Sequence, residues 1–458
     1  MTHEPADSLH RLMKQLLDAG VAKSVADAAA IFAGYRITFV VGYDAARNRH
    51  DQAALLTGVA LASRVFLGGV TVAGNLDVPL LLPLRLGSTL DEAVYRLGAR
   101  RGDGAGPNDP CVFFGGARRA RAKGFEIRPV YSGWRAGIVP AHGEFDAGEG
   151  FVMEIAPMLA AALAISEAFF YVQEEVKIAG RRAIGLSLWD LSKADWQSPD
   201  SAAPPVRYLP SKLWLIGLGH LGQAYLWALS LLPYASRAEA TLVLQDVDVV
   251  TPSALSTSVL SVTNGIGQKK TRLCAEWAEL LGFSTIITER FFDELCKRAA
   301  HEPGVAMCGL DNALGRLALD GAGFDFVVEA GLGRGYRDFR TMRLHTLPGS
   351  RPASAIWASP SQQEDVTDRV AYRQLLKSGE LDQCGVTLLA GKAVGAPFVG
   401  AVAACLAVSE LLRLLHGGVV HDLIDVDLHS LEHRQAIRSP RDFATLNPGF
   451  VMVKARDE

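Results

Sequence analysis

The chain has 458 residues, of which 21% are charged and 49% hydrophobic, and its net charge is −3. At about 150 residues per domain this length predicts two or three folded units, and we expect two halves. The chain lacks the broad basic excess that is typical of nucleic-acid-binding proteins, so we expect no nucleic-acid partner.

The sequence carries no clear targeting or membrane segment. Residues 1–19 are polar and charged, which is unlike a signal peptide. The most apolar stretch, residues 153–172, contains Glu154, Pro157 and Glu167 and therefore predicts a buried helix rather than a membrane span. The six cysteines never fall as Cys-x-x-Cys, which argues against a zinc site or a disulfide framework. We expect a cytoplasmic protein with no membrane partner.

The first half of the chain predicts a nucleotide-type fold without a nucleotide motif. Residues 37–41 read as a first strand, but a lone Gly42 follows them where a phosphate-binding loop needs several glycines. Residues 198–210 contain four prolines and read as a linker. We therefore expect domains at 1–197 and 211–458, joined by residues 198–210.

The second half opens on the most informative segment, KLWLIGLGHLGQ at residues 212–223. A strand that runs into Gly217-x-Gly219-x-x-Gly222 and then a helix places backbone N–H groups and a helix N-terminus where phosphates approach closely. This fingerprint predicts a dinucleotide or ATP and does not distinguish between them.

The elements that follow predict a parallel, doubly wound sheet. Residues 241–244 read as a strand that ends at the acidic Asp246-x-Asp248, which completes a βαβ unit. Residues 263–281 read as a helix, residues 304–310 as a buried strand with Asp311 at its carboxyl end, and residues 324–330 as another strand. Ligands bind at the carboxyl ends of such strands.

The last part of the chain contains a long polar segment and an apolar helix. Residues 347–385 predict a long loop with at most one short helix, and a helix runs from Pro397 to His416. This helix contains Leu-Ala-Val-Ser-Glu at 406–410, which echoes Leu-Ala-Ile-Ser-Glu at 163–167 in the first half. The echo favours a duplicated architecture, so we predict an α/β fold of two Rossmann-like halves, of which the first is degenerate.

Four motifs of the second half occur in an order that resembles a known family. They are the glycine loop, Asp246-x-Asp248, Gly267-Gln-Lys-Lys270, and Asp311-Asn312 with Arg316. Over residues 211–420 the chain resembles the ubiquitin-activating and sulfur-carrier-activating adenylyltransferases, the ThiF/MoeB type. The resemblance implies ATP and Mg²⁺ as cofactors. By resemblance Asp246 would hold the ribose, Asp248 would lie near the phosphates, Lys270 would contact the phosphates, and Asp311 would bind Mg²⁺.

The resemblance also implies an activity and partners. The family pairs one active with one degenerate fold and activates the C-terminal carboxylate of a small β-grasp protein. We therefore expect adenylation of a ubiquitin-like protein, a thioester on a cysteine, and transfer to a conjugating enzyme, as in bacterial antiphage conjugation systems. The working unit stays open between one chain and a homodimer.

Cys384 is the candidate for the thioester. It lies in Asp382-Gln-Cys-Gly385 at the end of the long polar segment, where related enzymes carry a catalytic cysteine. The other cysteines fall mostly in apolar patterns that are typical of buried thiols.

One motif departs from the family. Where the family has Ser-Asn-Leu-x-Arg-Gln, this chain has residues 253–258 with Ala254 for the asparagine and Thr257 for the arginine. The lost arginine normally faces the triphosphate. The candidates to replace its charge are Lys269, Arg272, Arg334, Arg47 and Arg49.

Plainer interpretations stay open for the same residues. The glycines also serve tight packing, Asp246 and Asp248 also end a strand, Lys270 also fits a solvated helix, and Asp311-Asn312 also fits a helix cap. Two other functions fit: an NAD-dependent oxidoreductase, because Asp246 follows the glycines at roughly the dinucleotide spacing, and a catalytically dead binding scaffold.

Overall fold

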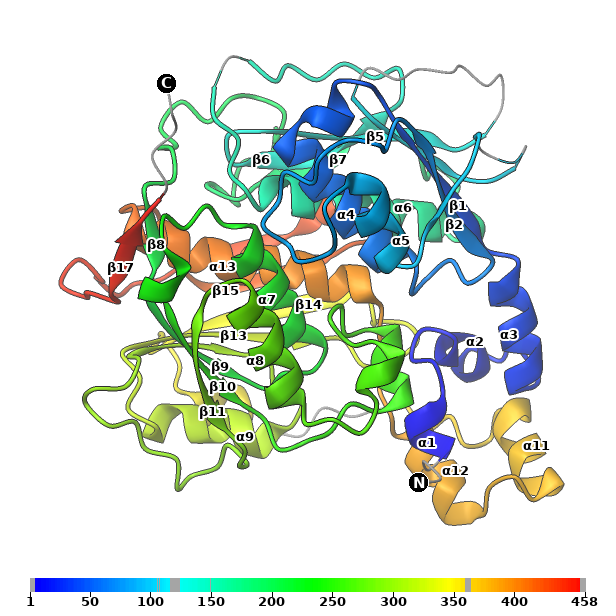
Figure 1. Ribbon diagram of the computed structural model, residues 1–458. Helices are drawn as coiled ribbons and strands as arrows, with labels where there is room; N and C mark the ends of the chain where they lie inside the picture. The colour runs from blue at the N-terminus through cyan, green and yellow to red at the C-terminus, as the bar shows by residue number, and fades with distance from the viewer. Residues whose placement is uncertain are drawn as a thin grey trace.

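The computed structural model describes residues 5–104, 106, 108–115, 124–148, 150–358 and 364–453. Figure 1 shows two halves: the sheet of the first, in blue and cyan, lies above, and the second, in green, yellow and red, lies below. Each half contains one large sheet, and helices fill the space between the two sheets.

The first sheet has seven strands in the order β3-β2-β1-β4-β5-β6-β7. The first five of these are joined by parallel pairings, and β5–β6 and β6–β7 are antiparallel. The strands are β1 (Arg36–Val41), β2 (Gly69–Gly74), β3 (Arg100–Arg101), β4 (Cys111–Phe114), β5 (Glu126–Ser132), β6 (Arg135–Pro140) and β7 (Ile184–Ser187).

The second sheet has eight strands in the order β11-β10-β9-β12-β13-β14-β15-β16. It repeats the order of the first sheet and adds β16, so the predicted duplication of an α/β architecture is confirmed. The strands are β9 (Lys212–Ile216), β10 (Thr241–Gln245), β11 (Ser284–Thr288), β12 (Val305–Cys308), β13 (Phe326–Leu332), β14 (Thr341–Leu347), β15 (His421–Asp427) and β16 (Gln435–Arg438).

Four helices form the layer between the sheets: α4 (Arg49–Ala62), α6 (Ala156–Val172), α7 (His220–Leu231) and α13 (Pro397–Leu415). In this layer α6 packs on α4 and α13, and α13 packs on α7. Within the described residues α13 is long and apolar enough to cross a membrane, but 89% of its most apolar window is buried inside the protein. It is therefore a core helix, and α6 confirms the buried helix that the sequence predicted.

The other helices are shorter than these four. They are α1 (Pro5–Ser8), α2 (Lys14–Asp18), α3 (Val25–Ala33), α5 (Leu90–Arg96), α8 (Lys270–Leu280), α9 (Ala313–Leu317), α10 (Ala353–Ile356), α11 (Val370–Ser378) and α12 (Gln383–Ala390). Helices α1 to α3 and helices α11 and α12 meet at the lower right of Figure 1, although they come from opposite ends of the chain.

The echoed glutamates occupy equivalent buried positions in α6 and α13. Glu167 pairs with Arg182 at 2.9 Å, and Glu410 accepts from Nδ1 of His421 at 2.9 Å. A buried carboxylate is stable only when it is paired and hydrogen-bonded. The repeated Ser-Glu sequence therefore marks the same structural solution in both halves.

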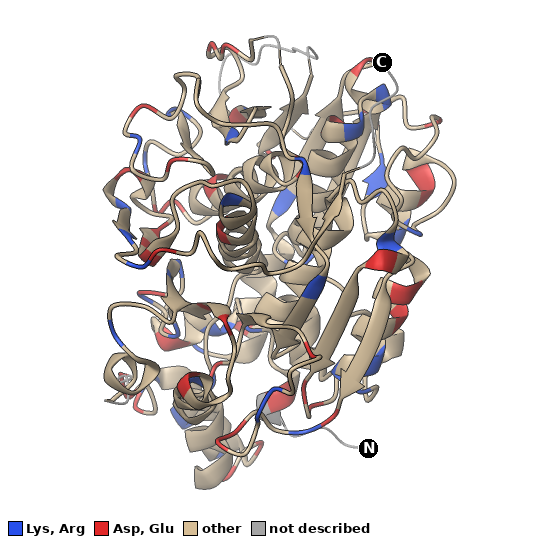
Figure 2. Ribbon diagram, turned by 90° about the vertical axis from the view of Figure 1, so that its left-hand side faces the viewer, with Lys and Arg blue, Asp and Glu red and all other residues tan. Residues whose placement is uncertain are grey.

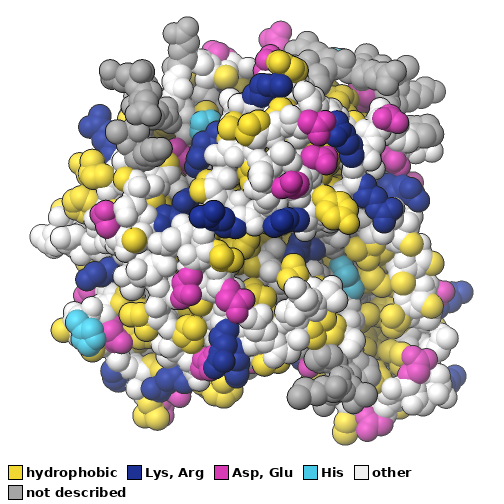
Figure 3. Space-filling model, in the orientation of Figure 1, with side chains coloured by type: hydrophobic (Ala, Val, Ile, Leu, Met, Phe, Trp, Pro, Cys, Tyr) yellow, Lys and Arg dark blue, Asp and Glu magenta, His cyan; other side chains and the backbone are white. Residues whose placement is uncertain are grey.

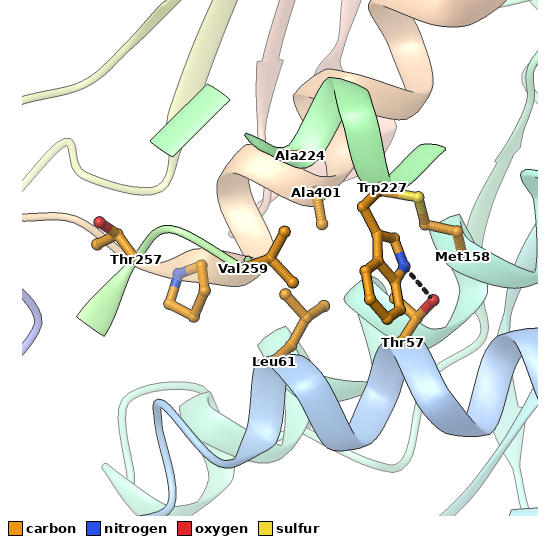
Figure 4. A pocket seen from close by; sticks show the side chains of 9 residues that line it. Thr57, Leu61, Met158, Ala224, Trp227, Thr257, Val259 and Ala401 are labelled. Carbon is orange, nitrogen blue, oxygen red and sulfur yellow. Dashed lines mark hydrogen bonds between the residues drawn. The ribbon is translucent and has the colours of Figure 1, made fainter. Parts of the chain in front are cut away.

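The halves share a continuous buried interface. Trp227 on α7 donates from Nε1 to Oγ1 of Thr57 on α4 at 2.9 Å, as Figure 4 shows. This contact borders a small apolar cavity, which is lined by Thr57, Leu61, Met158, Ala224, Trp227, Thr257, Val259, Pro397 and Ala401. Because the hydrogen bond crosses between the halves inside apolar surroundings, it fixes how α7 lies against α4.

Two predicted elements differ from the structure. The helix predicted at 263–281 begins at Lys270, because a short 3₁₀ turn at Thr263–Gly265 and Gly267 with φ +87° interrupt the chain before it. The segment 347–385 is expected to hold at most one short helix, but α10, α11 and the start of α12 lie within it.

The predicted linker ends in a strand, β8 (Tyr208–Pro210), which pairs with β17 (Phe450–Met452). Figure 2 shows acidic and basic residues interspersed over the molecule, in keeping with the small net charge of −3.

Candidate nucleotide and cysteine sites

The glycine loop packs tightly against the start of α7 at one glycine and is open to a ligand at another. Gly217 has φ +82°, which glycine adopts without strain. A Cβ at Gly222 would lie 2.1 Å from the carbonyl oxygen of Gly217, so α7 approaches the loop as closely as its backbone allows. A Cβ at Gly219 would meet nothing nearer than Nζ of Lys270 at 4.0 Å. The packing interpretation therefore fits Gly217 and Gly222, and Gly219 faces open space beside a cation.

A further glycine, Gly309, completes this approach and was not identified from the sequence. Its N–H donates to the carbonyl oxygen of Ile216 at 2.8 Å, and a Cβ there would lie 2.8 Å from Cβ of Leu221. A glycine directly after the buried strand at 305–308 was the available signal.

Asp246 supports the loop from the end of β10. Its Oδ2 accepts from the N–H of Leu218 at 2.6 Å, and its Oδ1 accepts from the N–H of Asp248 at 2.8 Å. The side chain of Asp246 is 9% exposed and that of Asp248 is 63% exposed. Asp246 therefore does more than end a strand, because its carboxylate links the glycine loop at Leu218 to the segment that follows β10 at Asp248.

Lys270 is the cation at this edge of the sheet. Its Nζ lies 2.8 Å from Oδ2 of Asp248 and 3.9 Å from Oδ2 of Asp246. Burial lowers the pKa of Lys270, but the carboxylates of Asp246, Asp248 and Asp311 together raise it above its usual value. Because the side chain is 14% exposed and paired with acids, Lys270 is not the solvated helix lysine of the plainer interpretation.

The carboxylate of Asp311 is exposed at the carboxyl end of β12. The helix-cap interpretation belongs to Asn312, whose Oδ1 accepts from the N–H of Gly315 at 2.6 Å. Among the described residues no hydrogen bond or ion pair occupies the Asp311 carboxylate. Arg316 instead forms an ion pair at 2.8 Å with the buried Glu329.

This donor set fits one kind of metal. No group of three or more His, Cys, Asp or Glu side chains within the described ranges is arranged to hold an ion. Mg²⁺ often binds through one or two carboxylates together with water and substrate phosphates. A single exposed carboxylate such as Asp311 fits that mode and does not fit a protein-made metal cage.

Arg11 of the first half reaches this site and was missed by sequence reasoning. Its Nη2 donates to Oγ of Ser253 at 3.1 Å, and its N–H donates to Oγ of Ser256 at 3.0 Å. Burial lowers the pKa of Arg11, while the carboxylates of Asp7 and Asp311 raise it in part. Arginine keeps its charge in proteins, so Arg11 brings a cation to the segment from which the family's arginine is missing.

The five cations that the sequence offers as replacements for the missing arginine make different contacts in the structure. Only Arg334 among them contacts the site, because its Nη1 donates to the carbonyl oxygen of Asp311 at 3.4 Å. The prediction for Arg49 and Arg47 is wrong: Arg49 contacts the carbonyl oxygen of Leu231 at the far end of α7, and Arg47 stacks on Tyr43 at 3.8 Å.

Lys269 and Arg272 have other partners. Lys269 donates to the carbonyl oxygen of Val247 at 2.5 Å, and Arg272 pairs with Glu289 at 2.9 Å. Thr257 itself packs on the backbone that crosses above it, since a Cβ at Gly395 would lie 3.0 Å from its Cγ2.

His220 lies in the glycine loop but supplies no positive charge. Burial lowers its pKa to about 4, so the imidazole is neutral at physiological pH. A Cβ at Gly400 would lie 2.3 Å from Nε2 of His220, which shows that the ring fills the space against α13. His220 therefore packs the N-terminus of α7 against α13.

The first half blocks the equivalent position. Asn48 caps α4 by accepting from the N–H groups of His50 and Asp51 at 2.8 and 3.1 Å. Gly42 donates to the carbonyl oxygen of Phe114 at 3.0 Å and leads into a 3₁₀ turn, Ala45–Arg47. The helix N–H groups that would meet phosphate are already satisfied, in agreement with a degenerate half.

Cys384 lies in the first turn of α12, so the prediction of a loop position is wrong. Asp382 caps the helix by accepting from the N–H of Gly385 at 2.7 Å. All six cysteines lie within the described residues, and Cys384 is exposed whereas the other five are buried. Burial raises the pKa of Cys308 to about 12. Cys384 is thus the one thiol that a second protein can reach without unfolding.

Comparison with known proteins identifies the family in both halves. Residues 36–188 match the BilD N-terminal domain and residues 209–418 match the BilD C-terminal domain. The bacterial E1-like protein BilD of Collimonas sp. (strain OK412) is 45% identical over 419 residues, which cover 91% of this chain and 90% of that protein.

Solved structures show weaker similarities. E. coli MccB matches with a TM-score of 0.34 and 12% identity over 51% of this chain and 63% of that chain. The E. coli tRNA N6-threonylcarbamoyladenosine dehydratase TcdA matches with a TM-score of 0.29 and 16% identity over 45% of this chain and 86% of that chain. These values are too low to support a functional argument. The sequence relationship is sufficient by itself, and it shows that this chain belongs to the family of the bacterial E1-like protein BilD.

Proposed function

We propose that this chain uses ATP to adenylate the C-terminal carboxylate of a ubiquitin-like β-grasp protein. One observation carries the proposal: the open side of the glycine loop at Gly219, the cations Lys270 and Arg11, and the free carboxylate of Asp311 converge at the carboxyl edge of the second sheet. The E1-like name of the 45% identical relative supports the same chemistry.

The charges of the site match the reaction. A carboxylate oxygen of the substrate attacks the α-phosphorus of ATP, the bond to the bridging oxygen breaks, and pyrophosphate leaves with the electron pair. Negative charge is crowded on the phosphates throughout, and preorganised cations stabilise such a transition state. Lys270 and Arg11 supply two of these cations, and the loop N–H groups supply hydrogen-bond donors.

ATP and Mg²⁺ belong to the proposal as cofactors. Asp311 would hold the ion, which would neutralise phosphate charge when bound. Lys270 pairs with Asp248 at 2.8 Å in the structure. We expect Lys270 to exchange this carboxylate for a phosphate oxygen, while Asp246 keeps the glycine loop in place and lies at the end of β10 where the ribose of a Rossmann fold is held.

The second step of the proposal uses Cys384. Its thiolate attacks the carbonyl carbon of the acyl-adenylate, a thioester bond forms, and AMP leaves; the thiol proton passes to solvent before the attack. Cys384 is exposed in the first turn of α12, so a second protein can approach its sulfur. The thioester would then pass to a conjugating enzyme, and we expect this system to act in the bacterial cytoplasm against phage.

Mutation of Cys384 tests the second step. With candidate ubiquitin-like proteins, Cys384→Ala should keep ATP–pyrophosphate exchange and lose the adduct that thiol reagents release, while Cys384→Ser should form a slower, thiol-resistant ester. Thr387→Ala, on the same exposed helix, is the matched control. An undiminished adduct in Cys384→Ala would assign the thioester to another cysteine.

The two rival functions predict other results. An NAD-dependent oxidoreductase would show a rise in melting temperature with NAD and none with ATP. A binding scaffold would bind its partner protein without any nucleotide-dependent chemistry. We expect ATP to raise the melting temperature and NAD to leave it unchanged.

A further inference from the structure

A fully buried ion pair lies where the two ends of the protein meet. Lys14 and Asp18 occupy α2 of the first half, with Nζ and Oδ2 at 2.6 Å and side chains that are 0% and 3% exposed. Burial lowers the pKa of Lys14 and raises that of Asp18, and each group partly offsets the shift of the other. Taking two charges out of water is costly, so such a pair calls for an explanation other than stability.

The ion pair contacts both α12, which carries Cys384, and the neighbouring helix α11. Nζ of Lys14 donates to the carbonyl oxygen of Ala390, the last residue of α12, at 3.1 Å. The hydroxyl of Tyr372 on α11 donates to Oδ1 of Asp18. One buried pair on α2 thus binds one helix through the lysine and the other helix through the aspartate.

Cys384 lies at the opposite end of the helix that Lys14 holds. Helix α12 has eight residues, Gln383–Ala390, with Cys384 in its first turn. A helix of this length is about 12 Å long and moves as one piece. Fixing the carbonyl group at its C-terminal end therefore also restricts where the thiol at its N-terminal end lies.

The same N-terminal segment contacts the nucleotide site. Arg11 lies one turn before Lys14, donates to Ser253 and Ser256, and accepts through its carbonyl oxygen from the N–H of Gly395 at 3.4 Å. Residues 11–18 therefore connect the adenylation site on one side with helices α11 and α12 on the other. Figure 1 shows this segment between the two. The hydrophobic side chains of residues 11–18 are buried, and the face of the molecule drawn in Figure 3 mixes hydrophobic with charged side chains.

We propose that Lys14, Asp18 and Tyr372 are positioning residues for the thioester step. They set the place of Cys384 relative to the acyl-adenylate that forms at the second sheet. This inference rests on the proposed function. The first half lacks a glycine loop of its own, and this inference gives it another role, which is to orient the acceptor cysteine.

The test removes both charges together. The double variant Lys14→Met/Asp18→Leu leaves no unpaired buried charge, so its fold should survive. We expect ATP–pyrophosphate exchange to stay within twofold of wild type and single-turnover thioester formation on Cys384 to fall at least tenfold. Lys392→Met is the control, since Lys392 follows α12 and pairs with Asp7 of α1 at 2.9 Å but is 31% exposed. It should change both rates by less than twofold.

A second variant covers the case in which the double variant does not fold. Tyr372→Phe keeps the ring and the ion pair and removes only the tie to α11; we expect a threefold to tenfold loss of thioester rate at unchanged exchange. A thioester rate equal to wild type in the folded variants would show that the cluster is packing alone. An equal loss of exchange and thioester would show that residues 11–18 serve the nucleotide site instead. Absence of exchange in the wild type would overturn the proposed function itself, which keeps the two failures distinct.

Discussion

Arg11 donates a hydrogen bond from Nη2 to Oγ of Ser253 over 3.1 Å, although the two residues belong to different halves of the protein. Ser253 begins the segment in which the family carries an arginine and this chain carries Thr257. Thr257 packs against Gly395 and lines the apolar cavity between the halves. We therefore propose that Arg11 of the first half replaces the cation that Thr257 does not supply.

Replacement of Arg11 tests this relationship. Arg11→Ala should lower ATP–pyrophosphate exchange by roughly 10² to 10³, because one preorganised cation would be missing from the transition state. The fold should lose only about 1 kcal/mol, the usual net value of a hydrogen bond. Arg47→Ala is the control, since Arg47 stacks on Tyr43. Exchange that survives intact in Arg11→Ala would leave Arg334 as the remaining candidate.

Lys270→Ala should weaken ATP more than the protein substrate. The side chain pairs with Asp248 and Asp246 in the structure and has a phosphate as its proposed partner. We expect the apparent affinity for ATP to fall at least tenfold in isothermal titration, with turnover reduced as well. Arg272→Ala, which removes an exposed ion pair with Glu289, should change neither by more than twofold. If Lys270→Ala and Arg272→Ala had the same ATP affinity and the same turnover, the role of Lys270 would be contradicted.

Substitutions at the neighbours Asp311 and Asn312 should affect different properties, namely activity at Asp311 and stability at Asn312. Asp311→Asn keeps the size of the side chain and removes its charge, so exchange should collapse with an unchanged circular dichroism spectrum. Asn312→Ala removes the cap that accepts from the N–H of Gly315, and it should cost about 1 kcal/mol of stability with much of the activity retained. Full exchange in Asp311→Asn would end the assignment of Mg²⁺ to this carboxylate.

The glycines of the loop should differ from one another. A Cβ at Gly222 would lie 2.1 Å from the carbonyl oxygen of Gly217, so Gly222→Ala should lower stability by about 1–3 kcal/mol through overpacking. Gly219→Ala adds a methyl group on the open side near Lys270 and should reduce ATP affinity more than melting temperature. The comparison is made by thermal unfolding and titration on both variants. If Gly219→Ala and Gly222→Ala lost stability and ATP affinity to a similar extent, the loop would serve packing alone.

Much of the nucleotide fold was predictable from local sequence. The strand at 212–216, the glycines after it and Asp246 follow one another in the chain, so pattern and spacing were sufficient to place them. The duplication was visible because the same buried Ser-Glu pair recurs in α6 and α13. Pro397 marked the start of α13 for a similar reason, since its fixed φ suits the first turn of a helix.

The rest depends on contacts between distant parts of the chain. No motif surrounds Arg11, and its partners Ser253 and Ser256 lie more than two hundred positions later. The sequence predicts a long loop with at most one short helix over residues 347–385, whereas α11 and α12 form there and pack on α2 and α1 from the other end of the chain. Lys14 and Asp18 look like an ordinary exposed i, i+4 pair in the sequence, and only the fold shows that they are buried.

ATP–pyrophosphate exchange with candidate ubiquitin-like proteins that end in glycine tests the central claim most directly. The account predicts exchange that requires one such protein and requires Mg²⁺. Exchange should be reduced in Lys270→Ala, lost in Asp311→Asn and retained in Cys384→Ala. Calorimetry on the same sample should give about one ATP per chain, because Asn48 closes the equivalent position in the first half. Exchange that proceeds without any protein substrate, or two equivalent ATP sites per chain, would contradict the account.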